Sequence, residues 1–268
     1  MNDFLQLLTF GFFRNAILAT VLTSISCGIV GTYIVSRRIV FISGGITHAS
    51  FGGIGMAFYF GFDPLAGAVL FAILSALGIQ FFIKNAGIRE DSSIAIWWSL
   101  GMAIGIIFVF LTPGYTPNMT SYLFGNILTV SKTELFLMSL LVSGILLFFS
   151  LHFRKILYIT FDEEFARTAG VRVNLFNYTM MILVAVTIVL NIRAAGIILI
   201  MSLLAIPQAT ANLFTKNFRH LLILSTFFAF SGAISGLILS YYLDVPSGAA
   251  IIFTQVIIFF ILRVIKTF

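Results

Sequence analysis

Residues 152–172 read HFRKILYITFDEEFARTAGVR and form the largest polar insert of an otherwise apolar chain. This stretch holds seven of the 24 charged residues, since the whole chain has 15 basic and nine acidic ones. Apolar runs long enough to cross a bilayer lie on both sides of it. A membrane protein rarely keeps such an insert at mid-chain unless something in the water docks there. We therefore expect a membrane protein that a soluble partner engages at residues 152–172.

The composition excludes an ordinary soluble protein. Of the 268 residues, 60% are hydrophobic and 9% are charged, and the mean hydropathy is +1.12. Soluble domains carry roughly 25% charged residues. Transmembrane β-strands alternate apolar and polar residues, whereas these runs are apolar on every side. We expect an all-α, polytopic helical integral membrane protein with a single domain over residues 1–268.

Nine transmembrane helices are predicted, or eight if one short span does not cross. The predicted spans are residues 15–36, 46–61, 64–83, 93–111, 133–151, 173–191, 194–212, 220–242 and 248–265. If the amino terminus lies outside, only Arg14, Lys132 and Arg193 of the 15 basic residues fall in outside segments. This positive-inside bias predicts that residues 152–172 and the carboxyl terminus are cytoplasmic. The sequence pI of about 9.7 reflects these clusters between spans and does not indicate nucleic-acid binding.

A short helix is predicted inside the polar insert. Asp162, Glu163 and Glu164 suit the positive end of a helix dipole, and Gly170 is placed to end the helix after Ala166. Such a helix, held at the membrane surface, would fit a groove on a soluble protein. An ordinary amphipathic connector is the alternative interpretation.

The segment SGGITHASFGGIG (residues 43–55) contains His48, the one histidine in the interior of a predicted span, since His152 and His220 lie near the cytoplasmic edges. An ionisable group at membrane depth is costly and is by default a functional candidate. Neutral imidazole is a common ligand of transition metals. Thr47 and Ser50 add oxygens to this candidate metal path. A histidine hydrogen-bonded between helices, with the glycines as a packing face, is the alternative.

Three further segments carry weaker signals. Pro207 is expected to bend or break a span, and Gln208 and Thr210 could satisfy the freed backbone groups or line a path. On the outer side, Asp244 is expected to cap the helix that follows it, and Pro246 and Gly248 form a tight connection. The stretch SYLFGNIL (residues 121–128) is too short to span and could be re-entrant or a surface helix.

Together these segments resemble the membrane permease subunits of bacterial ABC importers for zinc, manganese or iron. The resemblance runs from about residue 14 to residue 264, and its strongest matches are EEFARTAG (163–170), IPQATA (206–211), YLFG (122–125) and DVPSG (244–248). It implies a type II ABC importer-like permease in the bacterial cytoplasmic (inner) membrane. It also implies a homodimer that works with a cytoplasmic ATPase pair and an extracytoplasmic metal-binding protein. The residues implied to couple to the ATPase are Asp162, Glu163, Glu164, Ala166, Arg167 and Gly170.

One position departs from the family's pattern. The family motif is similar to G-D-x-x-[ST]-H-[AS], with an aspartate four residues before the histidine and therefore on the same helix face. Here Gly44 occupies the aspartate position, and Thr47 and His48 match the rest. Because Mn²⁺ prefers oxygen ligands, the missing carboxylate favours zinc.

The predicted function is a transport subunit without enzymatic activity. No G-x-x-x-x-G-K-[ST] phosphate loop occurs, so the energy of ATP hydrolysis must come from a separate subunit. No permanently bound cofactor is expected; the divalent metal ion binds transiently as it passes His48 of each copy. The alternatives are an ABC permease for a metal chelate and an ion-coupled secondary transporter. An intramembrane protease is disfavoured, since neither H-E-x-x-H nor G-x-S-x-G occurs.

Overall fold

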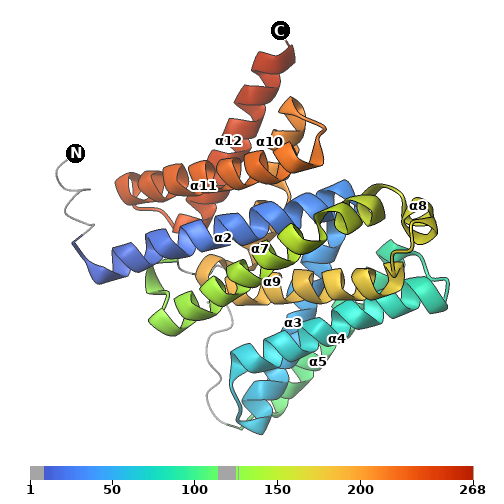
Figure 1. The fold of residues 1–268 in the computed structure, drawn as a ribbon. Coiled ribbons are helices and arrows are strands. Elements are labelled where there is room, and N and C mark those ends of the chain that lie inside the picture. Colours follow the sequence, from blue (N-terminus) through green and yellow to red (C-terminus); the bar gives the residue numbers. More distant parts are fainter. Residues whose placement is uncertain (1–8, 114–124, 126, 268) are drawn as a thin grey trace. The chain divides into compact units, whose positions relative to one another are not determined.

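The described part of the chain folds into helices. A computed structural model describes residues 9–113, 125 and 127–267, and no strand occurs among them. The elements are α2 (Gly11–Ser36), α3 (Phe41–Phe60), α4 (Pro64–Asn85), α5 (Glu90–Leu111), the 3₁₀ helix η1 (Ile127–Thr129), α7 (Lys132–Phe161), α8 (Glu163–Thr168), α9 (Val173–Leu203), α10 (Ile206–Phe214), α11 (Phe218–Leu243) and α12 (Ser247–Thr267) (Figure 1). The expected all-α fold is confirmed.

Two compact units share these helices, and each is built from segments far apart in the sequence. The first unit consists of Met1–Ser36, Thr120–Ser150 and Asn191–Phe268, and the second of Arg37–Met119 and Leu151–Leu190. Helices α7 and α9 therefore contribute to both units. This division does not test the expected single domain, which stays a prediction.

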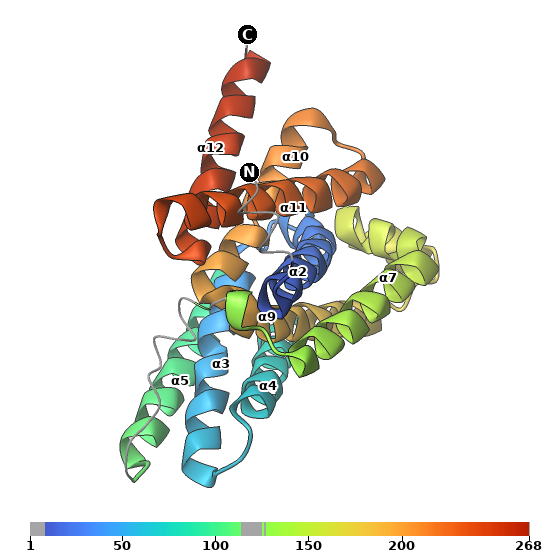
Figure 2. The same ribbon diagram turned by 90° about the vertical axis from the view of Figure 1, so that its left-hand side faces the viewer.

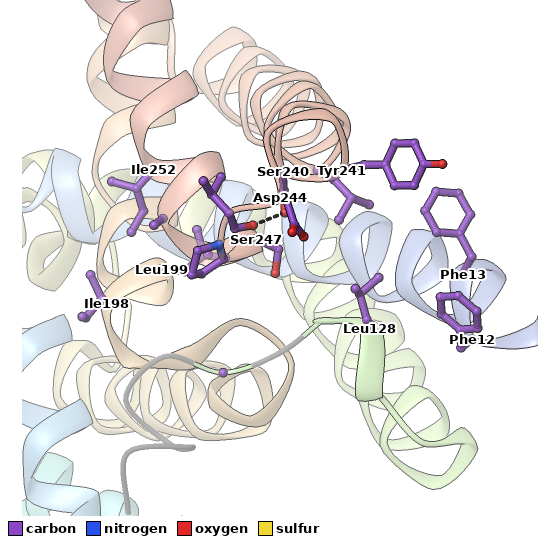
Figure 3. Close-up of a pocket in the computed structure, with 16 residues that line it drawn as sticks. Phe12, Phe13, Leu128, Ile198, Leu199, Ser240, Tyr241, Asp244, Ser247 and Ile252 are labelled. Carbon is purple, nitrogen blue, oxygen red and sulfur yellow. Dashed lines mark hydrogen bonds between the residues drawn. The ribbon is translucent and has the colours of Figure 1, made fainter. Parts of the chain in front are cut away.

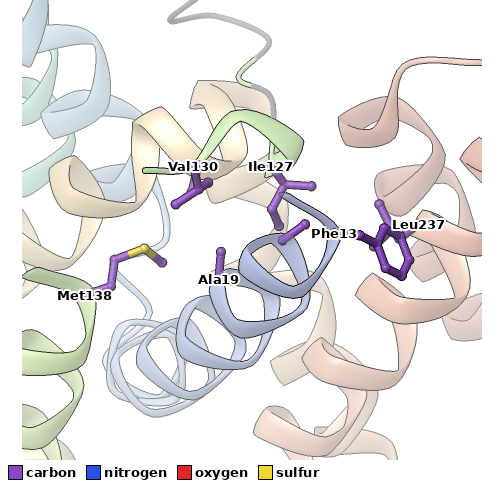
Figure 4. Close-up of a cluster of buried hydrophobic side chains, with 8 residues drawn as sticks. Phe13, Ala19, Ile127, Val130, Met138 and Leu237 are labelled. Atoms are coloured by element: carbon purple, nitrogen blue, oxygen red, sulfur yellow. The ribbon is translucent and has the colours of Figure 1, made fainter. Parts of the chain in front are cut away.

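In the first unit, α11 packs against α2, α10 and α12, as the neighbouring ribbons in Figure 2 illustrate for α11 and α12. Buried side chains of α2 meet η1 and α11 in an apolar cluster (Figure 4). Its members are Phe13, Ala16, Ala19, Ile127, Val130, Met138, Ala194 and Leu237. Such a cluster is consistent with helix packing in lipid, where van der Waals contact rather than water exclusion holds helices together.

A buried polar contact joins α2 to α9 within this unit. The Oγ1 of Thr23 donates to the Oδ1 of Asn191 at 2.8 Å, and the Nδ2 of Asn191 donates to the Oγ of Ser26 at 3.3 Å. All three side chains are buried. In a bilayer, hydrogen bonds of this kind hold helices together because lipid offers no alternative partner.

In the second unit, α3 packs against both α4 and α5, and these helices lie side by side in Figures 1 and 2. Glycines allow the backbones of α3 and α5 to touch. A Cβ on Gly101 would lie 2.5 Å from the Cα of Ala49, and one on Gly105 would lie 2.7 Å from the carbonyl oxygen of Phe51. Residues 43–55 of α3 therefore pack against α5 with their backbones in direct contact.

The predicted count of eight or nine spans is not confirmed by length and composition. Among the described residues, seven helical stretches are long and apolar enough to cross a membrane. Helix α3, which corresponds to the predicted span 46–61, is not one of them, because its five glycines, its hydroxyl residues and His48 lower its mean hydropathy. The predicted spans 173–191 and 194–212 fall in one stretch of 42 residues, Val173–Phe214.

The backbone is interrupted inside both long helices. His152 has non-helical angles within α7 (φ −115°, ψ 17°) and marks the start of the predicted polar insert. Gly196 has φ 77° and ψ 162° within α9, a combination that is essentially restricted to glycine. A second interruption separates α9 from α10 at Leu204 and Ala205. The stretch Val173–Phe214 is therefore a broken helix rather than one continuous rod.

Candidate functional site

Helix α8 is the short helix predicted inside the polar insert. The Oδ1 of Asp162 accepts a hydrogen bond from the backbone N–H of Phe165 at 2.9 Å and so caps its amino-terminal end. Gly170, with φ 77°, follows its carboxyl-terminal end. Ala166 is fully buried and packs with Ile159 and Val173. The expected positions of the start and the end of this helix are confirmed.

Glu163 faces the interior of the second unit. Its Oε1 accepts hydrogen bonds from the Nη2 of Arg37 at 2.7 Å and the Nδ2 of Asn177 at 3.0 Å. The Nη1 of Arg37 also donates to the carbonyl oxygen of Ile159 at 2.8 Å, and Arg167 lies 3.9 Å from the Oε2 of Glu163. Glu163 and Arg37 thus tie α8 to the segment after α2, which makes Glu163 part of the support of the helix.

These contacts set the charge state of Glu163. Partial burial would raise the pKa of this carboxyl group. The hydrogen bonds from Asn177 and Arg37, together with the charges of Arg37 and Arg167, act in the opposite direction and outweigh the burial. The pKa therefore lies below its ordinary value of 4.5, and the side chain is ionised at neutral pH.

Replacing Glu163 with glutamine is expected to loosen α8 at neutral pH, because the ion pair with Arg37 is lost. A partly exposed pair of this kind contributes roughly 1 kcal/mol, or about fivefold in local opening. Because the pKa is lowered in the folded state, this stabilisation is complete above 4.5 and disappears as the pH falls through the lowered value. Hydrogen exchange of the α8 amides, measured against pH, checks both statements.

The exposed neighbour Glu164 supplies the control for this prediction. Glu164→Gln removes the same charge from the same helix and should leave the exchange of α8 close to wild type. Equal protection of α8 in wild type and Glu163→Gln at neutral pH would contradict the supporting role of Glu163.

The outer face of α8 presents acidic and aromatic side chains. Glu164 is exposed, and Phe165 is 51% exposed while its ring rests edge-on against Tyr158, with centroids 5.1 Å apart. This face contains Glu164 and Phe165, and Glu163 does not belong to it. A charged and an apolar group are thus available for a soluble partner at the same helix end.

His48 lies on α3 and is half-buried. The two hydroxyl residues expected beside it are fully buried and are bonded to their own helix: Thr47 donates to the carbonyl oxygen of Ser43, and Ser50 donates to that of Thr47 at 2.6 Å. At 100° per residue, Thr47 and Ser50 lie about 60° apart around α3, whereas His48 lies about 100° from Thr47 and about 160° from Ser50. The structure therefore does not gather Thr47, His48 and Ser50 into one set of ligands. Within the described ranges, no three His, Cys, Asp or Glu side chains come together as a metal site.

The residues around Pro207 are buried in the first unit. Pro207 stands in the first turn of α10, where a missing N–H costs nothing, so the break precedes it rather than following from it. The Nε2 of Gln208 donates to the carbonyl oxygens of Cys27 at 2.9 Å and Leu203 at 3.1 Å. Gln208 thus satisfies one carbonyl at the break and ties α10 to α2.

Thr210 completes this turn, since its Oγ1 donates to the carbonyl oxygen of Ile206 at 2.9 Å. The expectation that Gln208 satisfies backbone groups freed near Pro207 is confirmed. The alternative expectation, that Gln208 and Thr210 line a path, stays a prediction, as does any role in gating.

The expectation that Asp244 caps the following helix is wrong. Asp244 ends α11 in the left-handed conformation (φ 53°), and its backbone N–H bonds to the carbonyl oxygen of Ser240. The Oγ of Ser240 in turn donates to the carbonyl oxygen of Val245 at 2.6 Å. Pro246 bends the chain into α12, where its carbonyl oxygen accepts from Ala250. The tight connection was predicted correctly, but it is the end of α11 that Asp244 closes.

A cavity of about 640 Å³ adjoins this connection (Figure 3). It is lined mainly by apolar side chains of the first unit, among them Phe12 and Phe13, with Tyr241 beside Phe13 and Asp244 beside Ser240. Its lining also includes Gly125, Leu128, Ile198, Leu199, Leu237, Ser240, Val245, Pro246, Ser247, Gly248, Ala249 and Ile252. Residues 122–124 of the YLFG match lie outside the described residues. Gly125, at φ 57°, would collide with the backbone at Ala195 and Gly196 if it carried a side chain.

Three residues that are candidates for a functional role were not identified from the sequence. Arg37 was counted only among the cytoplasmic basic residues, and its opposite charge to Glu163 was the available signal. Asn191 was a polar residue at the end of a predicted span. Trp98 stacks on His48, and no sequence pattern connects two aromatic rings 50 positions apart.

The chain matches known proteins over almost its whole length. The model of the ABC 3 transport family matches residues 9–266. The manganese transport system membrane protein MntC of Halalkalibacterium halodurans is 33% identical over 247 residues, which cover 92% of this chain and 85% of that protein. The manganese import system permease protein ScaB of Streptococcus gordonii is 30% identical, covering 97% and 94%.

A solved structure agrees with these sequence matches. The structure of PsaBC from Streptococcus pneumoniae in complex with Fab has a chain that superposes with a TM-score of 0.85 at 32% identity, covering 97% of this chain and 94% of that one. A family match over almost the whole chain, with relatives at this identity and coverage, leaves one assignment. The chain belongs to the ABC 3 transport family, as a multi-pass helical membrane protein.

Proposed function

We propose that this chain is the membrane-spanning permease subunit of an ATP-driven importer for a divalent transition metal ion. Two copies form the translocation path in the bacterial cytoplasmic membrane, a separate ATPase pair binds on the cytoplasmic side, and an extracytoplasmic protein delivers the ion. The permease itself catalyses no reaction. Family membership sets aside the ion-coupled secondary transporter.

The observation that carries the proposal is α8. It is capped by Asp162 and clamped by Glu163, and it presents Glu164 and Phe165 outward. A short helix that is rigidly attached on one face and exposed on the other can transmit a push from a soluble motor to the helices around it. Movement of α8 would thereby shift α7 and α9, the helices that precede and follow it.

The contact between Arg37 and Glu163 supports α3 as a crossing helix. Since the two side chains form an ion pair of 2.7 Å, both lie on one side of the membrane, and the chain between them crosses an even number of times. Helices α4, α5 and α7 supply three crossings. Counting α3 as the fourth satisfies the contact, and its glycines and His48 then lie at membrane depth.

The cavity supports two crossings within Val173–Phe214. Phe12 and Asp244 line the same cavity, so an even number of crossings separates them. Helices α2, α4, α5, α7 and α11 make six crossings together with the proposed crossing of α3, so Val173–Phe214 would cross an even number of times, and two crossings fit its 42 apolar residues. The glycine-specific backbone at Gly196 permits such a reversal. The total is nine crossings, with the amino terminus outside and the carboxyl terminus in the cytoplasm.

His48 is the proposed contact for the ion. One imidazole cannot hold a divalent ion alone, because such ions take four or more ligands. A second His48 from the other copy, with water or backbone oxygens, would complete a transient site between the two copies. The relatives named above are manganese transporters, so the preference for zinc that Gly44 suggested gains no support, and Mn²⁺ is the first ion to test.

Charge reversal at Glu164 tests the docking role. In Glu164→Lys combined with Phe165→Ala, the cognate ATPase is expected to co-purify at least roughly tenfold less, as for the loss of interface hot-spot residues. The permease should still insert and dimerise. Pull-down of the ATPase from detergent-solubilised membranes measures this.

Asp91→Lys is the matched control, because Asp91 is an exposed acidic residue at the start of α5 on the same proposed side. It should retain the ATPase. Full ATPase recovery with the α8 double variant would overturn docking at α8. Uptake of a metal chelate that free Mn²⁺ and Zn²⁺ fail to compete with would instead favour a chelate permease.

A further inference from the structure

The imidazole of His48 lies flat against the indole of Trp98. The ring centroids are 4.5 Å apart and the ring planes differ by 2°. The two rings are therefore stacked almost parallel to each other. The two rings come from α3 and α5, which face each other in the second unit.

We propose that Trp98 is a positioning residue for metal binding by His48, which it holds in one orientation through this stack. The proposal rests on the proposed function, in which His48 contacts the passing ion. Trp98 itself does not bind the ion. Its indole restricts rotation of the imidazole and so fixes the direction in which the lone pair of the ring points.

The stack leaves the ring nitrogens of His48 accessible to a metal ion. Both nitrogens of an imidazole lie in the ring plane and bind metals through the ring edge. A partner above the ring covers one face and leaves that edge free. His48 is half-buried, and Trp98 is 37% exposed, so the pair reaches the surface of the unit and is not sealed in its core.

The glycine contacts fix the position of Trp98. The backbones of α3 and α5 touch at Ala49 and Gly101, one residue after His48 and three residues after Trp98. Helices in such contact cannot slide past each other without collision. The packing of the two backbones therefore fixes the position of the indole relative to the imidazole. The fixed indole holds the imidazole of His48 in one orientation, whereas a histidine that faced lipid without a stacking partner would rotate freely.

The size of the effect follows from the stack. Aromatic pairs of this geometry are worth roughly 2- to 10-fold in an equilibrium constant. Loss of the indole should therefore raise the KM for metal uptake roughly 3- to 10-fold and change the maximal rate less. A residue needed only for folding would instead lower the amount of assembled permease and leave KM unchanged.

The chain offers its own spectroscopic control, since its two tryptophans are Trp97 and Trp98. The Trp97 ring lies on the side of α4, against Phe82 at 6.0 Å between centroids. In Trp97→Phe, Trp98 is the sole indole, and in Trp98→Phe the emission comes from Trp97 alone. Each variant retains an aromatic ring at the changed position.

The first experiment titrates Mn²⁺, a paramagnetic quencher, into the purified full-length homodimer. Saturable quenching of Trp98 emission is expected in Trp97→Phe, and it should vanish when His48→Ala is added. Trp98→Phe should show no saturable quenching. If Trp97→Phe shows none while uptake still requires His48, the positioning role is overturned.

The second experiment measures Mn²⁺ uptake with the full importer in Trp98→Phe and Trp98→Leu. A raised KM in Trp98→Leu, with partial rescue in Trp98→Phe, supports the proposal. Unchanged KM in both variants, while His48→Ala abolishes uptake, overturns it and leaves the proposed function intact. If His48→Ala itself leaves uptake unchanged, both proposals fail.

Discussion

His48→Ala is expected to lower uptake of Mn²⁺ by roughly 10- to 100-fold or more, because even outer-shell partners of metal ligands cost that much when removed. The alanine variant should assemble normally, since His48 is half-buried and its stacking partner sits on a helix pair that glycine contacts hold together. Radioactive uptake into cells or proteoliposomes that carry the complete importer measures the change.

The neighbouring hydroxyl residue is the control. Ser50→Ala removes a buried hydroxyl whose bond is to its own helix, so uptake should stay within roughly twofold of wild type. An equal loss of uptake in Ser50→Ala and His48→Ala would place the path along another face of α3. Normal uptake in His48→Ala would make this histidine structural.

Gly196→Ala is expected to cause a large loss of stability. The angles φ 77° and ψ 162° are essentially closed to residues with a Cβ, and forcing such a residue into them costs roughly 1–3 kcal/mol. Gly125 approaches the backbone at Gly196 closely, so local rearrangement is obstructed as well. Thermal unfolding of the detergent-solubilised protein should show a midpoint lowered by several degrees, with little dimer recovered.

Gly144→Ala provides the comparison. Gly144 lies within α7 with open space where a Cβ would stand, so alanine should be neutral or stabilising by up to about 1 kcal/mol. If Gly196→Ala unfolds at the same temperature as Gly144→Ala, the broken helix does not require glycine at that position. The reversal proposed for Val173–Phe214 would then lose its support.

The ends of α8 illustrate what local sequence can predict. Asp162 caps the helix and Gly170 follows it, as expected, because capping depends on residues three or four positions apart. Asp244 illustrates the limit of such reasoning. An aspartate between two helices suits either the end of the first or the start of the second, and the left-handed backbone at Asp244 assigned it to the end of α11.

The spans were harder to count than to locate. Every predicted span corresponds to a described helix or part of one, yet α3 is too rich in glycine and polar residues to be recognised by hydropathy. The second crossing within Val173–Phe214 is short and broken. The crossing of α3 and the second crossing within Val173–Phe214 are both inferred from residues that lie close together in the fold but far apart in the sequence. A hydropathy window does not contain this information.

Amino-acid composition and short-range pattern were enough to establish a helical membrane protein and its short acidic helix. These features depend on transfer of side chains into lipid and on bonds within a few residues. The partners of the functional side chains came from the folded chain: Arg37 with Glu163, 126 positions apart, and Trp98 with His48. The second pair arises where the backbones of α3 and α5 approach at glycines, and many sequences with the same hydropathy would bring other residues together.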